Sequence, residues 1–134
     1  MAIVTNKKAI KTPGKQEVKY YLIAKVVGRK TEKDLAERIC RNTTLSMREA
    51  MMALAELRRG VEDFILDSYS VEISDWISFR PTIQSKGAET LSECDHSLVK
   101  SVHCRCNFSK EFRQTLQRAT FVDAGALHTN DPGD

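Results

Sequence analysis

The sequence predicts an α+β fold: a β-hairpin, two capped helices, an antiparallel sheet with a protruding arm, and a last helix. Two stretches with apolar residues at helical spacing begin at threonine or serine, and other stretches rich in β-branched and aromatic residues alternate with a period of two. The 134 residues, 41% apolar and 29% charged, are typical of a soluble globular protein. Apolar runs stay far below membrane-spanning length and residues 1–8 lack a signal-peptide pattern, so we expect a cytoplasmic protein.

Residues 1–29 predict a basic β-hairpin that precedes the main domain. The segment Thr12–Lys15 contains proline followed by glycine, which is a strong turn signal. Val18–Val27 is rich in β-branched and aromatic residues, which favours a strand, and Gly28 ends it.

Two helices are predicted next, each with its own N-terminal cap. Thr31 is followed three residues later by Asp34, and Ser46 by Glu49, which is the spacing of a capping box. The second helix is long and continues to about Leu66. Its first half is apolar around most of its circumference, whereas a small domain covers only one stripe of a helix. The sequence therefore predicts a second subunit, and mid-helix Gly60 predicts a close packing contact or a bend there.

The sheet is predicted from the return to a period of two. Val71–Phe79 predicts a strand pair with Ser74-Asp75 as a bulge or tight turn, and the polar Arg80–Ser101 predicts an extended hairpin or a long loop. Val102–Asn107 alternates as a half-buried strand does.

Ser109 is predicted to cap the last helix, which runs from Lys110 to about Arg118. Phe121-Val122 adds a further short strand, and residues 123–134 predict a flexible tail. The main domain is therefore expected over residues 30–122.

Charge is distributed unevenly along the chain. Residues 1–60 carry 14 Lys/Arg against 6 Asp/Glu, a balance of +8, whereas residues 61–134 carry 7 against 12, a balance of −5. Such asymmetry points to an anionic partner for the N-terminal part.

The order and spacing of these elements resemble the HU and integration-host-factor family of bacterial DNA-bending proteins. Asp34-Leu35, Leu45-Ser46 and Val71–Phe79 fall where HU has its corresponding residues, without a gap. Trp76 and Phe79 occupy the aromatic positions of the family's Gly-Phe-Gly-x-Phe segment. The segment Cys106–Phe112 stands where HU has Phe-Lys-Pro-Gly-Lys-x-Leu, and the resemblance covers residues 31 to about 119.

The N-terminal hairpin is an addition that HU lacks. It resembles the longer HU-related proteins of Bacteroides-type bacteria, which also carry a Gly-Ala-Glu-Thr segment such as Gly87–Thr90. The resemblance implies an obligate intertwined homodimer, localised to the nucleoid, that binds double-stranded DNA along a saddle-shaped sheet. Two arms would reach into the minor groove, where family members kink the duplex with a proline wedge. The implied function is non-catalytic, architectural and largely independent of DNA sequence.

The arm departs from the family pattern. Between residues 80 and 101 three basic residues balance three acidic ones, where HU arms are strongly basic, and no proline lies between Pro81 and Pro132. Lys110 and Arg113 match basic positions of the family's last helix. The candidate DNA-binding residues are Arg80, Lys86, Lys100, Arg105, Lys110, Arg113, Lys19 and Lys25. The neutral arm leaves open an alternative, a protein-interaction or scaffold dimer that kept the fold with little DNA affinity.

Other chemistries are less well supported by the sequence. A zinc site is suggested by Cys94-x-His96 followed by His103-Cys104-x-Cys106. The Cys-x-Cys spacing is unusual and alternation directs His103 away from Cys104, which favours packed core thiols. Asp95–Ser97 has the residue types of a hydrolase triad, yet contiguous residues do not converge. Tyr20-Tyr21 and Trp76 are interpreted as packing residues rather than stacking platforms. We expect no enzyme activity, no cofactor, no metal and no small-molecule substrate.

A helix-turn-helix reader over residues 31–66 is also rejected, because its second helix is too apolar to lie in a major groove.

Overall fold

The computed structural model describes residues 1–125, which divide into two compact units. One unit combines residues 1–30 with the chain from Leu116 onward, and the other is formed by Thr31–Thr115. Most of the predicted tail, residues 126–134, lies outside the described residues. Helices and strands are segregated along the chain, which confirms the α+β class.

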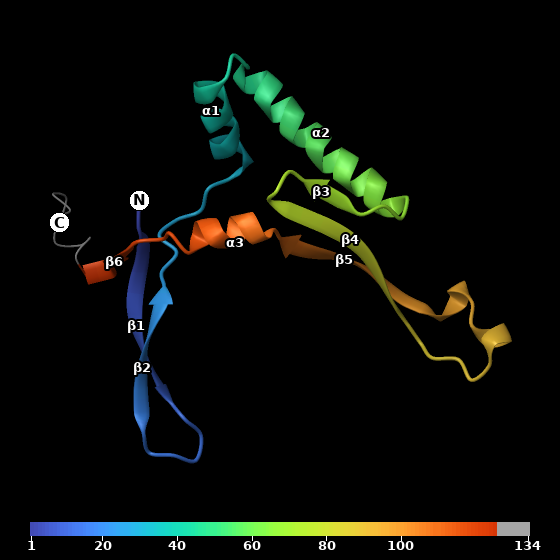
Figure 1. Cartoon of the computed structure of the whole chain (residues 1–134), viewed down its shortest axis with the longest axis horizontal. Helices are drawn as coiled ribbons and strands as arrows, with labels where there is room; N and C mark the ends of the chain where they lie inside the picture. The colour runs from blue at the N-terminus through green and yellow to red at the C-terminus, as the bar shows by residue number, and fades with distance from the viewer. Residues whose placement is uncertain (126–134) are drawn as a thin grey trace. The chain divides into compact units, whose positions relative to one another are not determined.

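The first unit is a three-stranded sheet with strand order β2-β1-β6. β1 (Ile3–Lys11) and β2 (Val18–Ala24) form the predicted hairpin, and β6 (Phe121–Asp123) pairs in parallel with the other side of β1 (Figure 1). The turn is closed by the Lys15 N–H, which donates to the Thr12 carbonyl at 3.1 Å. Gly14 adopts φ +80°, which a β-carbon would disfavour.

β2 is shorter than the predicted strand, which extended to Val27. The Lys25 N–H still bonds to the Val4 carbonyl at 2.7 Å. Because β1 begins at Ile3, the residues beyond Lys25 soon lack a neighbouring strand.

The second unit begins with a helical hairpin, α1 (Glu32–Asn42) and α2 (Met47–Leu66). Both predicted caps are confirmed. The Thr31 N–H donates to the Asp34 carboxylate at 2.8 Å, and the Glu49 N–H donates to Ser46 Oγ at 3.2 Å. Each helix therefore starts where its sequence satisfies the free backbone donors.

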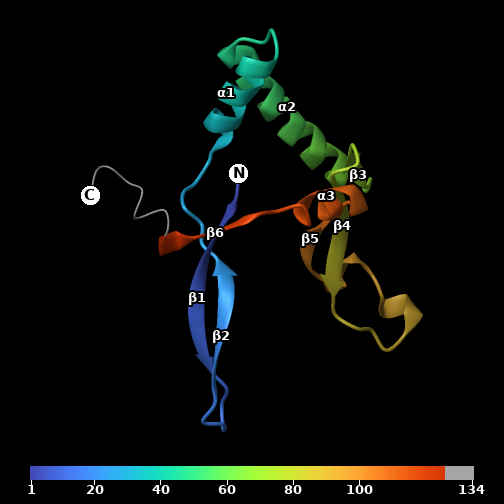
Figure 2. The same cartoon turned by 60° about the vertical axis from the view of Figure 1, so that its left-hand side comes forward.

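The sheet of this unit has strand order β3-β4-β5 (Figure 2). β3 (Val71–Ile73) and β4 (Ile77–Ser85) are joined by the predicted tight turn, in which Ser74 has φ 51°. β4 and β5 (Val99–Phe108) continue into an arm that projects beyond the sheet in both views (Figures 1 and 2).

Two single-turn 3₁₀ helices, Leu91–Glu93 and His96–Leu98, form the end of the arm. After β5 the chain enters α3 (Lys110–Leu116), which is shorter than the predicted helix. The chain turns at the end of α3, where the Ala119 N–H donates to the Leu116 carbonyl.

Alternation and register give the β4–β5 ladder one apolar and one polar face. Residues that pair across an antiparallel ladder share a face. The pairs Ile77–Phe108, Phe79–Cys106, Pro81–Cys104 and Ile83–Val102 form the apolar face. Together with the apolar side of α2 this face lines an open groove of about 640 Å³, whose walls include Leu54, Leu57, Val61, Ile65, Ile73, Ile77 and Phe79.

Very little of the single chain is buried. Among the described residues the buried apolar side chains are Val4, Ala36, Ala50 and Ala124, and no large side chain is fully enclosed. A stable fold of this size ordinarily encloses many large apolar residues, whereas here the apolar side chains that line the groove stay uncovered by the rest of the described chain.

Three packing predictions are wrong for the single chain. Cys104 and Cys106 are exposed thiols rather than packed core residues, because the groove onto which their face opens is unfilled. Trp76 is 46% exposed at the rim of the same groove. For Gly60 a close packing contact or a bend is predicted; a β-carbon added there would meet nothing within 4 Å, so the packing alternative is wrong and the bend stays a prediction.

Candidate nucleic-acid interface

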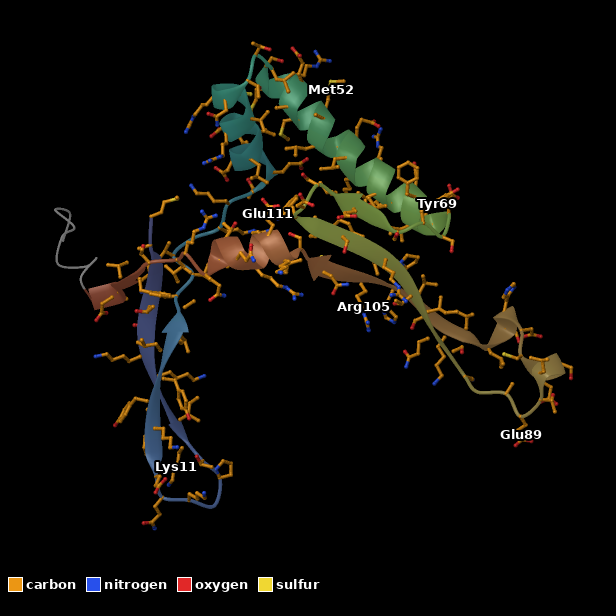
Figure 3. The ribbon with its side chains drawn as sticks, viewed as in Figure 1. Lys11, Met52, Tyr69, Glu89, Arg105 and Glu111 are labelled. Atoms are coloured by element: carbon orange, nitrogen blue, oxygen red, sulfur yellow. The ribbon has the colours of Figure 1, made fainter. Side chains whose placement is uncertain are left out.

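The polar face of the β4–β5 ladder carries the candidate site. Its cross-strand pairs are Ser78–Asn107, Arg80–Arg105, Thr82–His103 and Gln84–Ser101. Figure 3 shows Arg105 on the side of the sheet that faces away from α2. The face therefore presents hydrogen-bond donors while the opposite face presents apolar groups.

Arg80 and Arg105 lie directly opposite each other in this ladder. Side chains at such positions have Cβ atoms about 4.5–5.5 Å apart, and like charges there are destabilising. Within the described part of the chain the ion pairs join Arg58 to Glu62 and Arg59 to Glu56 on α2, and neither Arg80 nor Arg105 takes part in one. Two guanidinium groups thus share a site that an anion bridging them would stabilise.

The α2 ion pairs are local contacts on an exposed helix surface. Glu62 accepts a hydrogen bond from Arg58 Nε at 2.8 Å, and this bond, followed by the charge of Glu62, raises the pKa of Arg58 above its usual value. Each of these arginines is therefore paired with a carboxylate of its own helix.

Neutral donors extend the polar face beyond the arginine pair. The Ser101 hydroxyl lies 2.7 Å from His103 Nε2, and the Thr82 hydroxyl donates to the His103 carbonyl at 3.5 Å. Hydroxyl and imidazole groups of this kind contact phosphate and sugar oxygens without distinguishing bases. The acidic Glu72 shares the face on β3, opposite Ser78 and therefore diagonal to Arg80, but the two form no ion pair.

Lys86 and Lys100 lie at the base of the arm. The Lys86 N–H donates to the Leu98 carbonyl at 2.9 Å, which closes the ladder where the arm begins. Lys100 falls at the register shift opposite Gln84 and Ser85, so simple alternation does not assign it to a face.

Lys110 and Arg113 lie three residues apart on α3, whose start is fixed to the sheet. The Ser109 N–H donates to the Trp76 carbonyl at 2.8 Å, the Ser109 hydroxyl donates to the Asp75 carbonyl, and the Phe112 N–H donates to Ser109 Oγ at 3.1 Å. The Ser109 backbone and hydroxyl therefore fix the start of this helix to the turn between β3 and β4.

Lys19 and Lys25 belong to the other compact unit. Lys19 lies in β2, and Lys25 directly follows it with its N–H still bonded to the Val4 carbonyl. The two lysines are six positions apart in extended chain, so they share one face of the hairpin.

One residue at the end of the arm is missed by reasoning from the sequence alone. Leu91 begins the first 3₁₀ turn and is 93% exposed. A large apolar side chain in an otherwise polar segment is the signal that identifies it. Leu91 therefore places an exposed apolar group at the end of the arm.

The Asp95–Ser97 segment forms a local cap. Ser97 donates both its hydroxyl and its N–H to Asp95 Oδ1, the latter at 2.9 Å, and these bonds lower the pKa of Asp95. The serine hydroxyl is thus directed at the carboxylate, without the histidine between them that a triad requires.

Residues 1–125 contain neither a metal-binding cluster nor a membrane-spanning helix. No group of three His, Cys, Asp or Glu side chains in this range is placed to hold a metal ion. No helix there combines the length and apolar character that a membrane crossing requires.

Comparisons with known proteins identify the fold. A family described as an HU domain fused to a wHTH, Ig or glycine-rich motif matches residues 1–122. A crystal structure of a candidate bacterial DNA-binding protein from Bacteroides vulgatus matches with a TM-score of 0.65 at 9% identity. That match covers 91% of this chain and 48% of the other, so this chain spans about half the length of that protein. No curated protein matches the sequence.

Proposed function

Because the chain belongs to the HU-HIG family, in which an HU domain is fused to other motifs, we propose that it binds double-stranded DNA without catalysing a reaction. The observation that carries this proposal is the opposed pair Arg80–Arg105, which lies on the polar face of the sheet and forms no ion pair with an acidic residue within residues 1–125. Phosphate groups of a duplex are the anions that such a pair would bridge. Arginine, hydroxyl and lysine contacts to phosphate carry little sequence information, so the binding is largely sequence-independent and architectural.

We infer that the DNA-binding form is a homodimer. The groove between α2 and the apolar sheet face is open, and the single chain encloses no large side chain among its described residues. A second copy filling this groove would complete the core and bring two arginine pairs onto one surface. The two arms would then follow the minor groove, with Lys86, Lys100, Lys110 and Arg113 as further phosphate contacts. The N-terminal hairpin and the Gly87–Thr90 segment favour the Bacteroides-type branch of the family. The proposed place of action is the nucleoid in the cytoplasm.

Fluorescence anisotropy of a labelled duplex of about 40 base pairs, titrated at roughly 50 and 200 mM salt, tests the proposal. We expect tight binding at the lower salt that weakens steeply at the higher salt, with a slope of log K against log salt of about −0.9 per neutralised phosphate. Absence of binding at the lower salt would contradict the DNA function. It would leave the protein-interaction dimer, which the neutral arm favours, as the function to pursue.

Leu91 is proposed as the wedge that replaces the family's proline. Leu91→Ala is expected to leave the phosphate contacts intact but to reduce DNA bending, because the partly unstacked base step loses its apolar insert. Fluorescence energy transfer between dyes on the two duplex ends measures the bend, and anisotropy with the same duplex measures affinity. Leu98→Ala, in the second 3₁₀ turn of the same arm, is the matched control. Equal end-to-end distances for wild type and Leu91→Ala would remove Leu91 from this role.

A further inference from the structure

β2 is an open sheet edge without the usual protection. Its inner side pairs with β1, and within residues 1–125 no strand pairs with its outer side. The strand is seven residues long, contains no proline, and pairs with β1 without a register shift. Tyr20 and Leu22 are 75% and 69% exposed. Natural edge strands of this length ordinarily carry prolines, bulges or several charges, whereas Lys19 is the only charged residue within β2.

The hydrogen bonds to β1 determine which backbone groups of β2 point outward. The Lys25 N–H donates to the Val4 carbonyl, so Lys25 faces β1 with its backbone groups. The N–H and C=O groups of successive residues point to opposite sides of a strand. The backbone groups of Ile23, Tyr21 and Lys19 therefore also point toward β1. The outward groups are those of Val18, Tyr20, Leu22 and Ala24.

This alternation restricts how β2 can pair with another copy of itself. Hydrogen bonds between two copies can join only outward-facing residues, which are every second residue of β2. In an antiparallel self-pair, outward residues must therefore lie opposite outward residues. This requires the two-fold axis to pass through a residue and not between two residues. An axis at Tyr20 sets Lys15 against Lys25, and an axis at Leu22 sets Lys19 against Lys25. Both arrangements oppose like charges and leave part of the strand unpaired.

An axis at Tyr21 is different, because Tyr21 is the midpoint of β2. All seven residues then overlap, with Tyr20 opposite Leu22 and Val18 opposite Ala24 as the hydrogen-bonded pairs. The flanking Glu17 and Lys25, which are both exposed, then face each other at either end of the ladder. This register combines complete overlap with complementary charge.

We propose that the outer edge of β2 pairs antiparallel with β2 of a second copy about Tyr21, forming one continuous sheet from two hairpins. The two Tyr21 rings meet at the axis in a non-hydrogen-bonded pair, where side chains approach most closely. This contact uses neither the α2 groove nor the polar sheet face. It is therefore distinct from the groove dimer and from the Arg80–Arg105 surface, although the candidate DNA-binding residues Lys19 and Lys25 lie along it.

Charge exchange at the ends of the ladder tests the register. Glu17→Lys and Lys25→Glu each place like charges opposite each other at both ends, and each is expected to weaken the self-association about tenfold. The double variant Glu17→Lys/Lys25→Glu restores opposite charges and is expected to restore association. Lys7→Glu, which changes the net charge as Lys25→Glu does but lies on β1, is the control and should associate as the wild type does.

Sedimentation velocity of the full chain without DNA, from micromolar to submillimolar concentration, provides the measurement. We expect a wild-type association step that both single variants weaken and the double variant recovers. Single variants identical to the wild type, or a double variant that stays dissociated, would overturn the proposal. Because Glu17→Lys adds positive charge, DNA affinity is measured separately, and a lack of DNA binding would not affect the test of β2 pairing.

Discussion

Replacement of both Arg80 and Arg105 by alanine is expected to weaken duplex binding roughly a hundredfold at moderate salt. A dimer would lose four phosphate contacts, so the salt slope should become shallower by roughly 4. Folding should be unaffected or slightly favoured, since the substitution removes two like charges that oppose each other across the ladder. Anisotropy titrations at several salt concentrations measure the affinity and the slope, and thermal unfolding checks the fold.

The matched control removes two arginines from α2. Arg48→Ala/Arg59→Ala causes the same change in net charge, and Arg59 is an exposed side chain already paired with Glu56. Such a pair contributes little to stability, so the control should fold normally and lose only a small part of its DNA affinity. An equal loss in both double variants would mean that bulk charge, and not the opposed pair, governs binding.

Leu57→Glu is expected to abolish the dimer and to unfold much of the chain. Leu57 lines the groove and is 46% exposed in the single chain, so a second copy filling the groove would cover it. Burying a carboxylate there without a partner costs several kcal/mol, which is a large part of the stability of a small domain. Light scattering coupled to size exclusion gives the mass, and thermal unfolding gives the stability.

Two comparisons make the Leu57 experiment decisive. The wild-type melting temperature should rise with protein concentration, because the folded state is the associated one. Leu57→Met, which conserves volume and apolar character, should retain both the mass and this dependence. A Leu57→Glu chain that keeps the wild-type mass and melting temperature would contradict dimerisation through the groove.

The features that the sequence predicts correctly are those that depend on neighbouring residues. The capping pairs Thr31–Asp34 and Ser46–Glu49 start helices with contacts only three residues long, and Thr12–Lys15 closes its turn locally. Packing predictions are less successful because they require knowledge of what covers a face. Cys104 is expected in a core from its sequence pattern, yet in a single chain the groove beside it is open.

In the candidate site, too, local features are predicted from the sequence and features that depend on distant residues are not. Alternation along each strand indicates which residues share a face, but the opposition of Arg80 and Arg105 depends on cross-strand register. That register is set by the length of the arm and by the irregularity at Gln84 and Ser85, which local pattern does not reveal. Leu91 escapes prediction because a single apolar residue in a polar segment has no periodicity.

The parallel pairing of β6 with β1 has a consequence for the order in which the chain folds during synthesis. The Thr5 hydroxyl bonds to the Val122 carbonyl across 117 positions, and Ile3 pairs with Phe121. A nascent chain emerges from its N-terminus, so β1 and β2 leave the ribosome long before their third strand exists. A two-stranded ribbon is only marginally stable in water. Of the two sheets within residues 1–125, the one whose strands are translated first is therefore the one that is completed last.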